Sequence, residues 1–558
     1  MAKTNVQKKN KSFLVEAGII SISSFVVKII GVLFKIPLAH ILGDNMGIFS
    51  AAYSLYAMLY MISTSGLPVA ISRMIASSDK LGRQREVQRT FRVSLTVFTI
   101  IGVIATAVMM LASPWFFSAT EHSDSVQAAY VIAPTLLFVC VCSAFRGYYQ
   151  GLHNMYPTAI GQLIEAFFKM GLGLGATFWA RHMGYSPAVQ AACAISGISI
   201  GMLVEMVMLF LYRGATRKRL RPGTDRRAES VPVLTKKILL IALPATITSS
   251  ALYLSNFIDT VLIKRCLMLG GTAEAVAEDL YTAYTSYSTA IADLLPSTLI
   301  YPIAISVLPL VSAAVATREV SGANRSIVQS IRISVIIGLP SAAFLLATAP
   351  ACLSLLYSGA LTQYDRIDAL QVSSGTLRIL AIGIIFMAVV STTNALLQAV
   401  GKIWLPMLSV GIGVVFMALI EYFGVSGALG IYGAPVSSVS CYLIAASLNL
   451  YFLRRHTSAH LSPRFLFLRP ACCALLSGLA TWGTYCIAGR LLPGGGRLSA
   501  LLILLVCGVV TVFVYVASML LFCGIRANEV RLLPMGEKLA SFLIRRGWLH
   551  ESKGRAVR

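Results

Sequence analysis

Apolar stretches of eighteen or more residues recur along this chain as far as residue 524, and they restrict its fold more than any other feature. A helix of about 20 such residues crosses the roughly 30 Å hydrocarbon core of a bilayer. Because backbone exposed to lipid must satisfy its own hydrogen bonds, the chain has to form either membrane helices or a closed barrel. Barrel strands would appear as alternating segments of about ten residues, which this sequence does not contain. The sequence therefore predicts an all-α polytopic membrane protein.

The loops between these stretches alternate in charge. We predict fourteen spans: 13–37, 48–75, 91–117, 126–150, 157–180, 188–212, 237–264, 281–314, 327–349, 374–399, 403–423, 427–453, 466–489 and 498–523. Basic clusters such as 83–89, 213–237 and 454–469 fall in every second loop, whereas Glu121, Asp124 and the acids of 274–279 fall in the others. Positively charged loops lie in the cytoplasm. Both termini are therefore predicted to be cytoplasmic, with an amphipathic segment at 527–548 on the inner leaflet.

Composition excludes several other classes of protein. The 558 residues are 57% hydrophobic and 12% charged, with a net charge of +24 and a mean hydropathy of +0.78. The positive charge sits in loops, where anionic lipid rather than nucleic acid is the expected partner. The eleven cysteines form no CxxC pair and no metal-ligand spacing, and no phosphate loop or catalytic triad is present. We therefore expect neither an enzyme nor a bound metal or cofactor.

Two spans contain helix-breaking residues. Residues 281–314 carry Pro296, Pro302 and Pro309, and residues 48–75 carry Gly66 and Pro68. Breaks in membrane helices are tolerated where protein or cavity water pairs with the backbone groups left without hydrogen bonds, so they could mark a cavity. The alternative interpretation is that each break is a static kink that serves only helix packing.

Short motifs recur six spans apart. Pro68–Ser72 (PVAIS) in span two is echoed by Pro302–Ser306 (PIAIS) in span eight, and the pair Gln150 and Pro157 is echoed by Gln398 and Pro406. This repetition predicts two six-helix lobes, at 1–230 and 231–458. Residues 459–558 would supply two extra membrane helices and a basic cytoplasmic tail.

The first span carries a cation near its middle. Lys28 lies about 4–5 Å from the centre of this span, and Lys35 follows two turns later on nearly the same face. A cation at this depth costs about 2.5–3.5 kcal/mol on insertion scales. Two interpretations stay open: an anion visits Lys28 in a water-filled cavity, or a carboxylate of the bundle neutralises it.

Other polar residues in the spans are candidates for the same site. Glu165 and Lys169, four residues apart, can pair on one helix face or line a cavity. Asp259 and Asp293 could pair with Lys28 or bind H⁺ or Na⁺. Arg73 and Arg146 could line the cavity or extend to the inner surface. The substrate-binding candidates are Lys28, Lys35, Arg73, Tyr60, Asp259 and Asp293, and the secondary candidates are Glu165, Lys169, Arg146, Gln150, Asn394 and Gln398.

Four stretches resemble a known family: Gly31–Tyr56, Ser65–Ser72 (SGLPVAIS), Arg146–Glu165 (RGYYQGLHNMYPTAIGQLIE) and Asn394–Pro406. They are similar to the stage V sporulation protein B group of the multidrug/oligosaccharidyl-lipid/polysaccharide (MOP) exporter superfamily, close to the lipid II flippases. The resemblance covers nearly the whole chain. It implies a V-shaped, MATE-like pair of six-helix lobes in the bacterial cytoplasmic membrane.

The resemblance also implies roles for two residues. Lys28 falls where Gram-negative lipid II flippases carry a functional arginine, and Asp259 falls on the acid of their IDT motif. Two further arginines of that pattern are missing here, since Tyr60 lies near the first position and Ile291 near the second. Lys28 and Lys35, with Arg73, would then supply the positive charge.

The expected function is translocation of a polyprenyl-pyrophosphate-linked cell-wall precursor to the outer leaflet by alternating access. Lipid II for peptidoglycan, including the spore cortex, is the expected substrate, with membrane lipids and cell-wall synthesis proteins as partners. The membrane potential, Na⁺ or H⁺ could drive the step. The alternatives are a cation-coupled multidrug exporter, a flippase for another lipid-linked polysaccharide precursor, and a scaffold that transports nothing.

Overall fold

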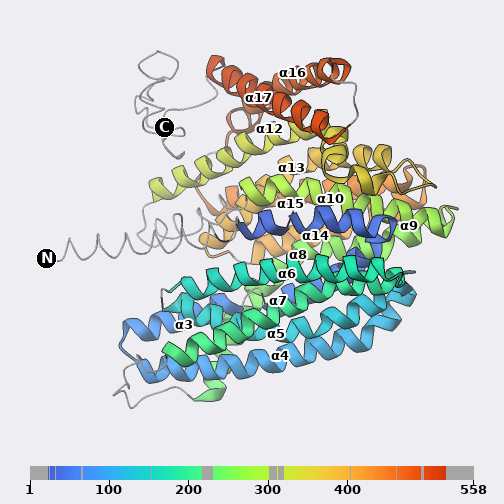
Figure 1. Ribbon diagram of the computed structural model, residues 1–558. Coiled ribbons are helices and arrows are strands. Elements are labelled where there is room, and N and C mark those ends of the chain that lie inside the picture. Colours follow the sequence, from blue (N-terminus) through green and yellow to red (C-terminus); the bar gives the residue numbers. More distant parts are fainter. Residues whose placement is uncertain are drawn as a thin grey trace. The chain divides into compact units, whose positions relative to one another are not determined.

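The computed structural model describes residues 23, 26–31, 33–64, 67–152, 154–216, 230–300, 311, 320–402, 404–459, 461–491 and 496–522. Every regular element of these residues is helical (Figure 1). The first helix is described at 26–31 and 33–42. The longer helices that follow are α2 (Met46–Thr64), α3 (Leu67–Lys80), α4 (Gln84–Ala119), α5 (Val126–Gly151), α6 (Tyr156–His182), α7 (Pro187–Thr216), α8 (Val231–Leu269), α9 (Glu274–Thr282), α10 (Thr289–Leu295), α12 (Val320–Leu361), α13 (Ala369–Ala399), α14 (Trp404–Ser426), α15 (Gly433–His456), α16 (Arg469–Leu491) and α17 (Arg497–Leu521).

The predicted all-α membrane architecture is confirmed. Within the described residues, ten helical stretches are long and apolar enough to cross a bilayer. Helix α6 coincides with predicted span five but is not among them, because Glu165 and Lys169 lower its hydropathy. The total of fourteen spans stays a prediction.

Of the two spans predicted to be broken, one is irregular in the described residues. In predicted span two, α2 ends at Thr64 and α3 begins at Leu67, while Gly66 lies outside the described residues, so a break there stays a prediction. Up to residue 300, predicted span eight contains the end of α9, a π-helical stretch at 283–288, α10, and a second π-helical stretch at Pro296–Ile300. The second stretch begins at a proline, which cannot donate a backbone hydrogen bond, and a π-helical turn shifts the hydrogen-bond pattern there. Pro302 and Pro309 lie outside the described residues.

The contacts of the chain divide it into two compact units. Unit 1 comprises Met1–Ser286 with Gly359–Arg366, and unit 2 comprises Tyr287–Ser358 with Ile367–Arg558. Unit 1 extends past the predicted lobe boundary at residue 230 because α8 packs against α2 and α3. The lobe division at 230 stays a prediction about membrane topology. The predicted amphipathic segment at 527–548 lies outside the described residues.

Helix α5 forms the core of unit 1. It packs against α2, α3, α4 and α7 (Figure 1), and residues 139–149 are buried around its whole circumference. A helix that is apolar on all sides belongs in such a central position. The motif RGYYQG at its end therefore faces protein rather than water.

Glycines set the closest helix approaches in unit 1. A Cβ at Gly147 would lie 2.9 Å from the Pro68 carbonyl oxygen, and a Cβ at Gly151 would lie 2.8 Å from Ile75 Cβ, so α3 approaches α5 closely only because both side chains are absent. In the same way Gly197 of α7 meets the backbone of Gly173 of α6, where a Cβ would lie 2.5 Å from the Gly173 Cα. Small residues allow this close packing where no hydrophobic force acts between helices in lipid.

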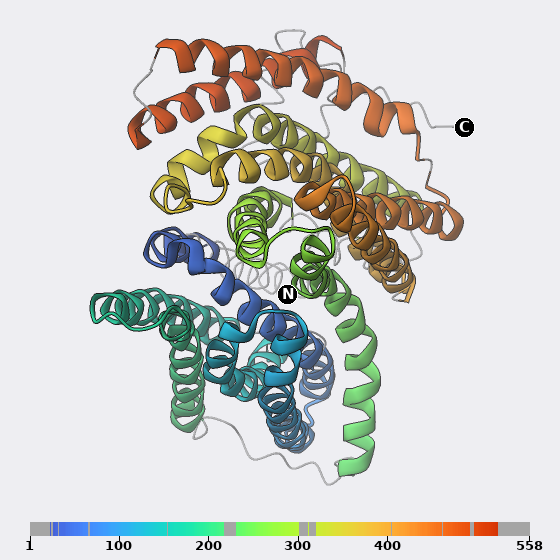
Figure 2. The same ribbon diagram turned by 90° about the vertical axis from the view of Figure 1, so that its right-hand side faces the viewer.

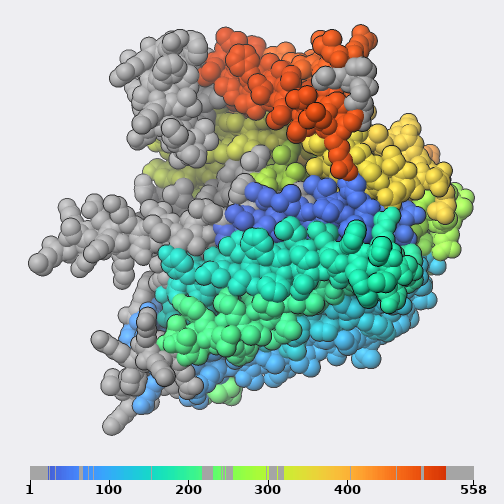
Figure 3. Space-filling view, viewed as in Figure 1, coloured from blue at the N-terminus to red at the C-terminus, as the bar shows by residue number. Residues whose placement is uncertain are grey.

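The outer surface of unit 1 is apolar along α6. Ile160, Phe167 and Phe178 are exposed on this helix, which forms a continuous face with α7 (Figure 3). Large exposed apolar side chains on a long helix are expected where lipid covers the protein.

Unit 2 repeats the packing pattern of unit 1. Helices α13 and α14 both pack on α15, as α5 and α6 both pack on α7. The final pair, α16 and α17, lies side by side (Figure 2) and is joined by Ser477, which donates to the Thr511 carbonyl at 3.0 Å. The two six-helix lobes inferred from the six-span echo stay a prediction.

Candidate functional site

A buried ion pair joins α5 to α7 in unit 1. Arg146 of α5 donates from Nε and Nη2 to the two carboxylate oxygens of Glu205 of α7, at 2.9 and 2.6 Å. The Glu205 residue is 0% exposed and Arg146 is 9% exposed. Two parallel hydrogen bonds of this kind match the planar guanidinium to a carboxylate and are among the strongest in proteins. The alternative in which Arg146 extends to the inner membrane surface is therefore wrong, because Glu205 holds it inside the bundle.

A second carboxylate shares the same guanidinium. Glu165 of α6 lies 3.6 Å from Arg146 Nη2, and its side chain is 24% exposed. Gly161, one turn earlier on α6, makes room for the pair, since a Cβ there would lie 2.8 Å from Glu205 Oε1. One cation thus faces two carboxylates, and Glu165 is the more weakly held and more accessible of the two.

Lys169, whose spacing from Glu165 predicted a pair or a cavity lining, lies against aromatic rings. Its ammonium lies over the rings of Phe34 and Tyr53, with 5.2 and 5.7 Å to the ring centroids, while Glu165 turns to Arg146. A cation over an aromatic face gains about 0.5–2 kcal/mol. Glu165 and Lys169 still lie within electrostatic range of each other, so both alternatives, pairing on α6 and lining a cavity, stay predictions.

An aromatic ladder runs along one face of α2. Phe49 stacks on Tyr53 with centroids 5.9 Å apart, Tyr53 meets Tyr56 at 5.9 Å, and Tyr56 meets Tyr60 at 5.7 Å. The spacing of three and four residues places all four rings on one side of the helix. Tyr60 lies within electrostatic range of Arg146, so the ladder leads from Lys169 towards the buried ion pair.

The two lysines of the first helix lie in the same unit. Lys28 and Lys35 are both half-buried, and both are engaged by other groups of the chain. Phe34, next to Lys35, is 1% exposed and packs against Phe49 with centroids 6.2 Å apart, which places the first helix against the ladder of α2. That Lys28 faces a cavity stays a prediction. The side chain of Arg73 lies outside the described residues, although its backbone belongs to α3.

Other predicted residues lie apart from this cluster. Asp259 of α8 is buried at 4% exposure, whereas Asp293 of α10 is exposed. Gln150 at the end of α5 and Gln398 at the end of α13 are half-buried. Asn394 of α13 accepts a hydrogen bond from Asn449 of α15 at 2.7 Å.

The link from Asn394 to Asn449 corresponds to the ion pair of unit 1. The echo that aligns Gln398 with Gln150 also aligns Asn394 with Arg146, and α15 corresponds to α7. Each unit therefore carries a buried polar link between equivalent helices, charged in unit 1 and neutral in unit 2. Of the two described links, only that of unit 1 offers charges to a substrate. In the part of the chain that the structure describes, no three His, Cys, Asp or Glu side chains are arranged to hold a metal ion.

The helical fold is similar to that of transporters of the MOP superfamily. Over 78% of this chain and 98% of the other, it is similar to an inward-facing multidrug resistance MATE family transporter of that superfamily, with a TM-score of 0.62 and 18% identity. A MOP superfamily transporter from Pyrococcus furiosus matches over 79% of this chain and 95% of its own, with a TM-score of 0.57 and 18% identity.

The chain belongs to the polysaccharide biosynthesis protein family, whose model matches residues 13–315, and a MatE model matches residues 244–423. Its relatives in Bacillus subtilis (strain 168) include the uncharacterized membrane protein YabM, 26% identical over 95% of this chain and 96% of YabM. They also include the lipid II flippase MurJ, 22% identical over 94% of this chain and 97% of MurJ. Stage V sporulation protein B is 22% identical over 79% of this chain and 83% of its own length. The predicted resemblance to stage V sporulation protein B and the lipid II flippases is confirmed.

Proposed function

We propose that this transporter flips a polyprenyl-pyrophosphate-linked glycan, with lipid II as its substrate, from the inner to the outer leaflet of the bacterial cytoplasmic membrane. Cations of unit 1 bind the pyrophosphate while the polyprenyl chain stays in lipid. The names of two relatives, lipid II flippase MurJ and stage V sporulation protein B, support this substrate class.

One observation carries the proposal. The Lys169 ammonium, on a helix within predicted span five, is held by the ring faces of Phe34 and Tyr53. An aromatic face recovers only part of the cost of a cation in the membrane, about 2.5–3.5 kcal/mol on insertion scales. A pyrophosphate beside Lys169 and the first helix would offset the rest. The ring faces leave the ammonium hydrogens available as donors to such an anion.

Arg146 contributes a second, switchable contact. Because Glu165 is only 3.6 Å from the guanidinium and partly exposed, an arriving phosphate can compete with it without disturbing the bidentate pair to Glu205. Protonation of Glu165 would have the same effect, which would couple H⁺ to substrate binding.

The membrane potential favours the proposed direction of transport. Moving an anion outward from an inside-negative cell is downhill by about 2.3 kcal/mol per charge per 100 mV. A pyrophosphate that carries two charges gains about twice as much, so ATP is not needed.

A cation-coupled multidrug exporter is the second candidate. Asp259, 4% exposed on α8, lies within the segment that the MatE model matches. A buried carboxylate of this kind would bind H⁺ or a cationic drug. This candidate requires efflux that depends on Asp259 and is indifferent to Lys28.

Transport of a fluorescent polyprenyl-pyrophosphate glycan in proteoliposomes tests the proposal. We expect Lys28→Ala and Lys169→Ala to abolish transport, and Lys28→Arg to keep part of it because the charge remains. Lys402→Ala is the matched control, since Lys402 is an exposed lysine outside the helices. Variants that insert, stay monodisperse and flip at the wild-type rate without Lys28 or Lys169 would overturn the assignment, and drug efflux lost only with Asp259→Asn would favour the exporter.

A further inference from the structure

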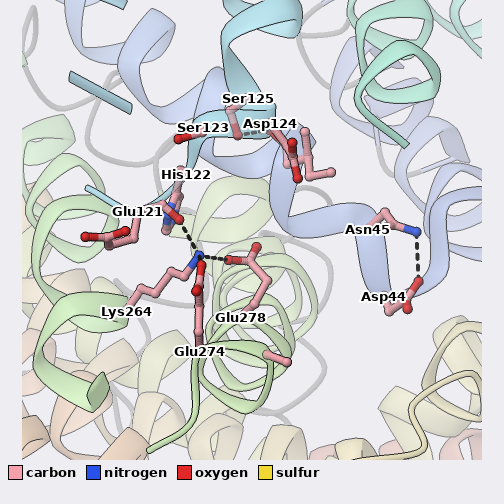
Figure 4. Close-up of a pocket in the computed structure, with 12 residues that line it drawn as sticks. Asp44, Asn45, Glu121, His122, Ser123, Asp124, Ser125, Lys264, Glu274 and Glu278 are labelled. Atoms are coloured by element: carbon pink, nitrogen blue, oxygen red, sulfur yellow. Dashed lines mark hydrogen bonds and ion pairs between the residues drawn. The ribbon is translucent and has the colours of Figure 1, made fainter. Parts of the chain in front are cut away.

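Unit 1 contains a strongly acidic pocket that the function above does not use (Figure 4). Its volume is about 470 Å³, and its lining residues come from the turn before α2, the link between α4 and α5, the end of α8 and the start of α9. The loop-charge pattern predicts that these segments lie outside the cell. Five carboxylates against one ammonium leave a formal charge of −4 for the lining side chains Asp44, Glu121, Asp124, Glu274, Glu278 and Lys264.

The single lysine of the pocket, Lys264, already forms ion pairs with acids of the lining. Lys264 of α8 pairs with Glu278 at 3.0 Å and with Glu274 at 3.4 Å, and it donates to the carbonyl oxygen of Glu121. Figure 4 shows these contacts converging on its ammonium group. Asp44 and Asp124 line the same pocket. The pocket therefore keeps a large excess of negative charge.

A buried histidine adds an independent sign of a ligand. His122 lines the pocket and is only 5% exposed, and neither of its ring nitrogens has a hydrogen-bond partner in the described part of the chain. Its ring instead meets Tyr281 edge to face, with centroids 4.6 Å apart. Burial lowers the pKa of His122 below its ordinary 6.5, so the ring is neutral at pH 7 and presents one acceptor nitrogen. Buried polar atoms normally have partners, and a ligand with N–H groups would supply one.

The arrangement of the acids and the volume of the pocket indicate which kind of cation fits it. No three acidic or histidine side chains among the described residues are close enough to chelate a metal ion. A pocket of about 470 Å³ lies within the range of about 300–1,000 Å³ typical of small-molecule sites. We propose that this pocket binds a small organic polyamine, whose ammonium groups pair with Asp44 and Glu278 and donate to the free nitrogen of His122.

Lys264 then acts as an internal competitor. It occupies the Glu278 carboxylate that an incoming ammonium would use. Replacing it with an apolar side chain of similar length removes one positive charge and releases two carboxylates. Binding should therefore become tighter, which a misfolded variant could not mimic.

Isothermal titration of purified full-length protein with putrescine tests the proposal. We expect saturable binding that Glu278→Gln and Asp44→Asn each weaken about fivefold, and that Lys264→Met tightens about fivefold. His122→Phe should also weaken binding. Asp365→Asn is the matched control, because Asp365 is an exposed acid of unit 1 that does not line the pocket.

Two results would overturn the proposal. One is non-saturable uptake of putrescine with equal heats for all these variants, as expected of surface charge alone. The other is equal affinity for putrescine and tetramethylammonium, which has no N–H group to donate to His122. Loss of flipping in Lys28 variants with unchanged putrescine binding would leave this site intact, so the two proposals fail separately.

Discussion

Replacing Glu205 by glutamine should destabilise the protein far more than the same change at Glu165. Both carboxylates face Arg146, but Glu205 makes two hydrogen bonds, at 2.9 and 2.6 Å, and is fully buried. Glu165 lies at 3.6 Å and its side chain is 24% exposed. The structure thus offers two matched Glu→Gln substitutions around one guanidinium.

The expected magnitudes follow from this geometry. Removing one partner of a buried ion pair costs about 3–5 kcal/mol. Glu165 remains beside the guanidinium in Glu205→Gln, so we expect about 3 kcal/mol. A partly exposed ion pair contributes about 1 kcal/mol or less, which we expect for Glu165→Gln. For a chain of 558 residues, whose unfolding entropy is about 1.2 kcal/mol/K, the difference of about 2 kcal/mol corresponds to a gap of about 2 °C in melting temperature.

Thermal unfolding of the detergent-solubilised protein, followed by loss of monodisperse protein on size exclusion, measures this gap. The double variant Arg146→Met with Glu205→Leu is the internal control, because apolar side chains of similar volume often replace a buried pair without loss. We expect this double variant to melt above Glu205→Gln. Equal melting temperatures for the two glutamine variants, or a double variant less stable than either, would refute the assigned roles.

Three further predictions concern other contacts. Gly161→Ala should lower the melting temperature and weaken transport, because its Cβ would lie 2.8 Å from Glu205 Oε1 and displace the Arg146–Glu205 ion pair. An unchanged melting temperature and transport rate would show that α6 can shift to accommodate the methyl group. Asn449→Ala should lower the free energy of unfolding by about 1–2 kcal/mol, because it removes the donor to Asn394. Asn449→Asp should destabilise the protein less than Asn449→Ala only if this buried link tolerates a charge. The same melting assay compares the two variants. Because burial lowers the pKa of His122 below 6.5, the unfolded chain binds more protons near and below that pH, so stability should fall as pH drops from about 7.5 to about 5.5. Melting curves across this range should be flatter for His122→Phe, and an equal slope would exclude His122 as the cause.

Much of the fold follows from sequence patterns that act locally. Span length, loop charge and helix-breaking residues depend on a few neighbouring residues, and they predicted α4–α7, α12–α17 and the irregular helix around Pro296. The close approach of α3 to α5 at Gly147 was not predicted, because a glycine in the sequence does not indicate which helix packs against it.

The candidate site was only partly predictable. Arg146 lies in predicted span four and Glu205 in predicted span six, and their 59-residue separation gives no spacing rule that pairs them. The spacing of Glu165 and Lys169 favoured a pair within α6, and it gave no sign of the guanidinium that α5 brings to Glu165. Apart from Asp44, the acids of the outer pocket were used only to assign topology, and Lys264 at the end of a predicted span gave no sign that they converge.

The proposed transport requires that cations of unit 1 bind a pyrophosphate, and an equilibrium binding measurement reports on this step alone. Purified protein should bind a short-chain polyprenyl pyrophosphate without any glycan, with an affinity that falls as salt rises. Lys28→Ala and Lys169→Ala should each weaken this binding about tenfold, equivalent to about 1.4 kcal/mol, whereas Lys28→Arg and Lys402→Ala should leave it close to wild type. Wild-type affinity in folded Lys28→Ala and Lys169→Ala proteins would contradict the account.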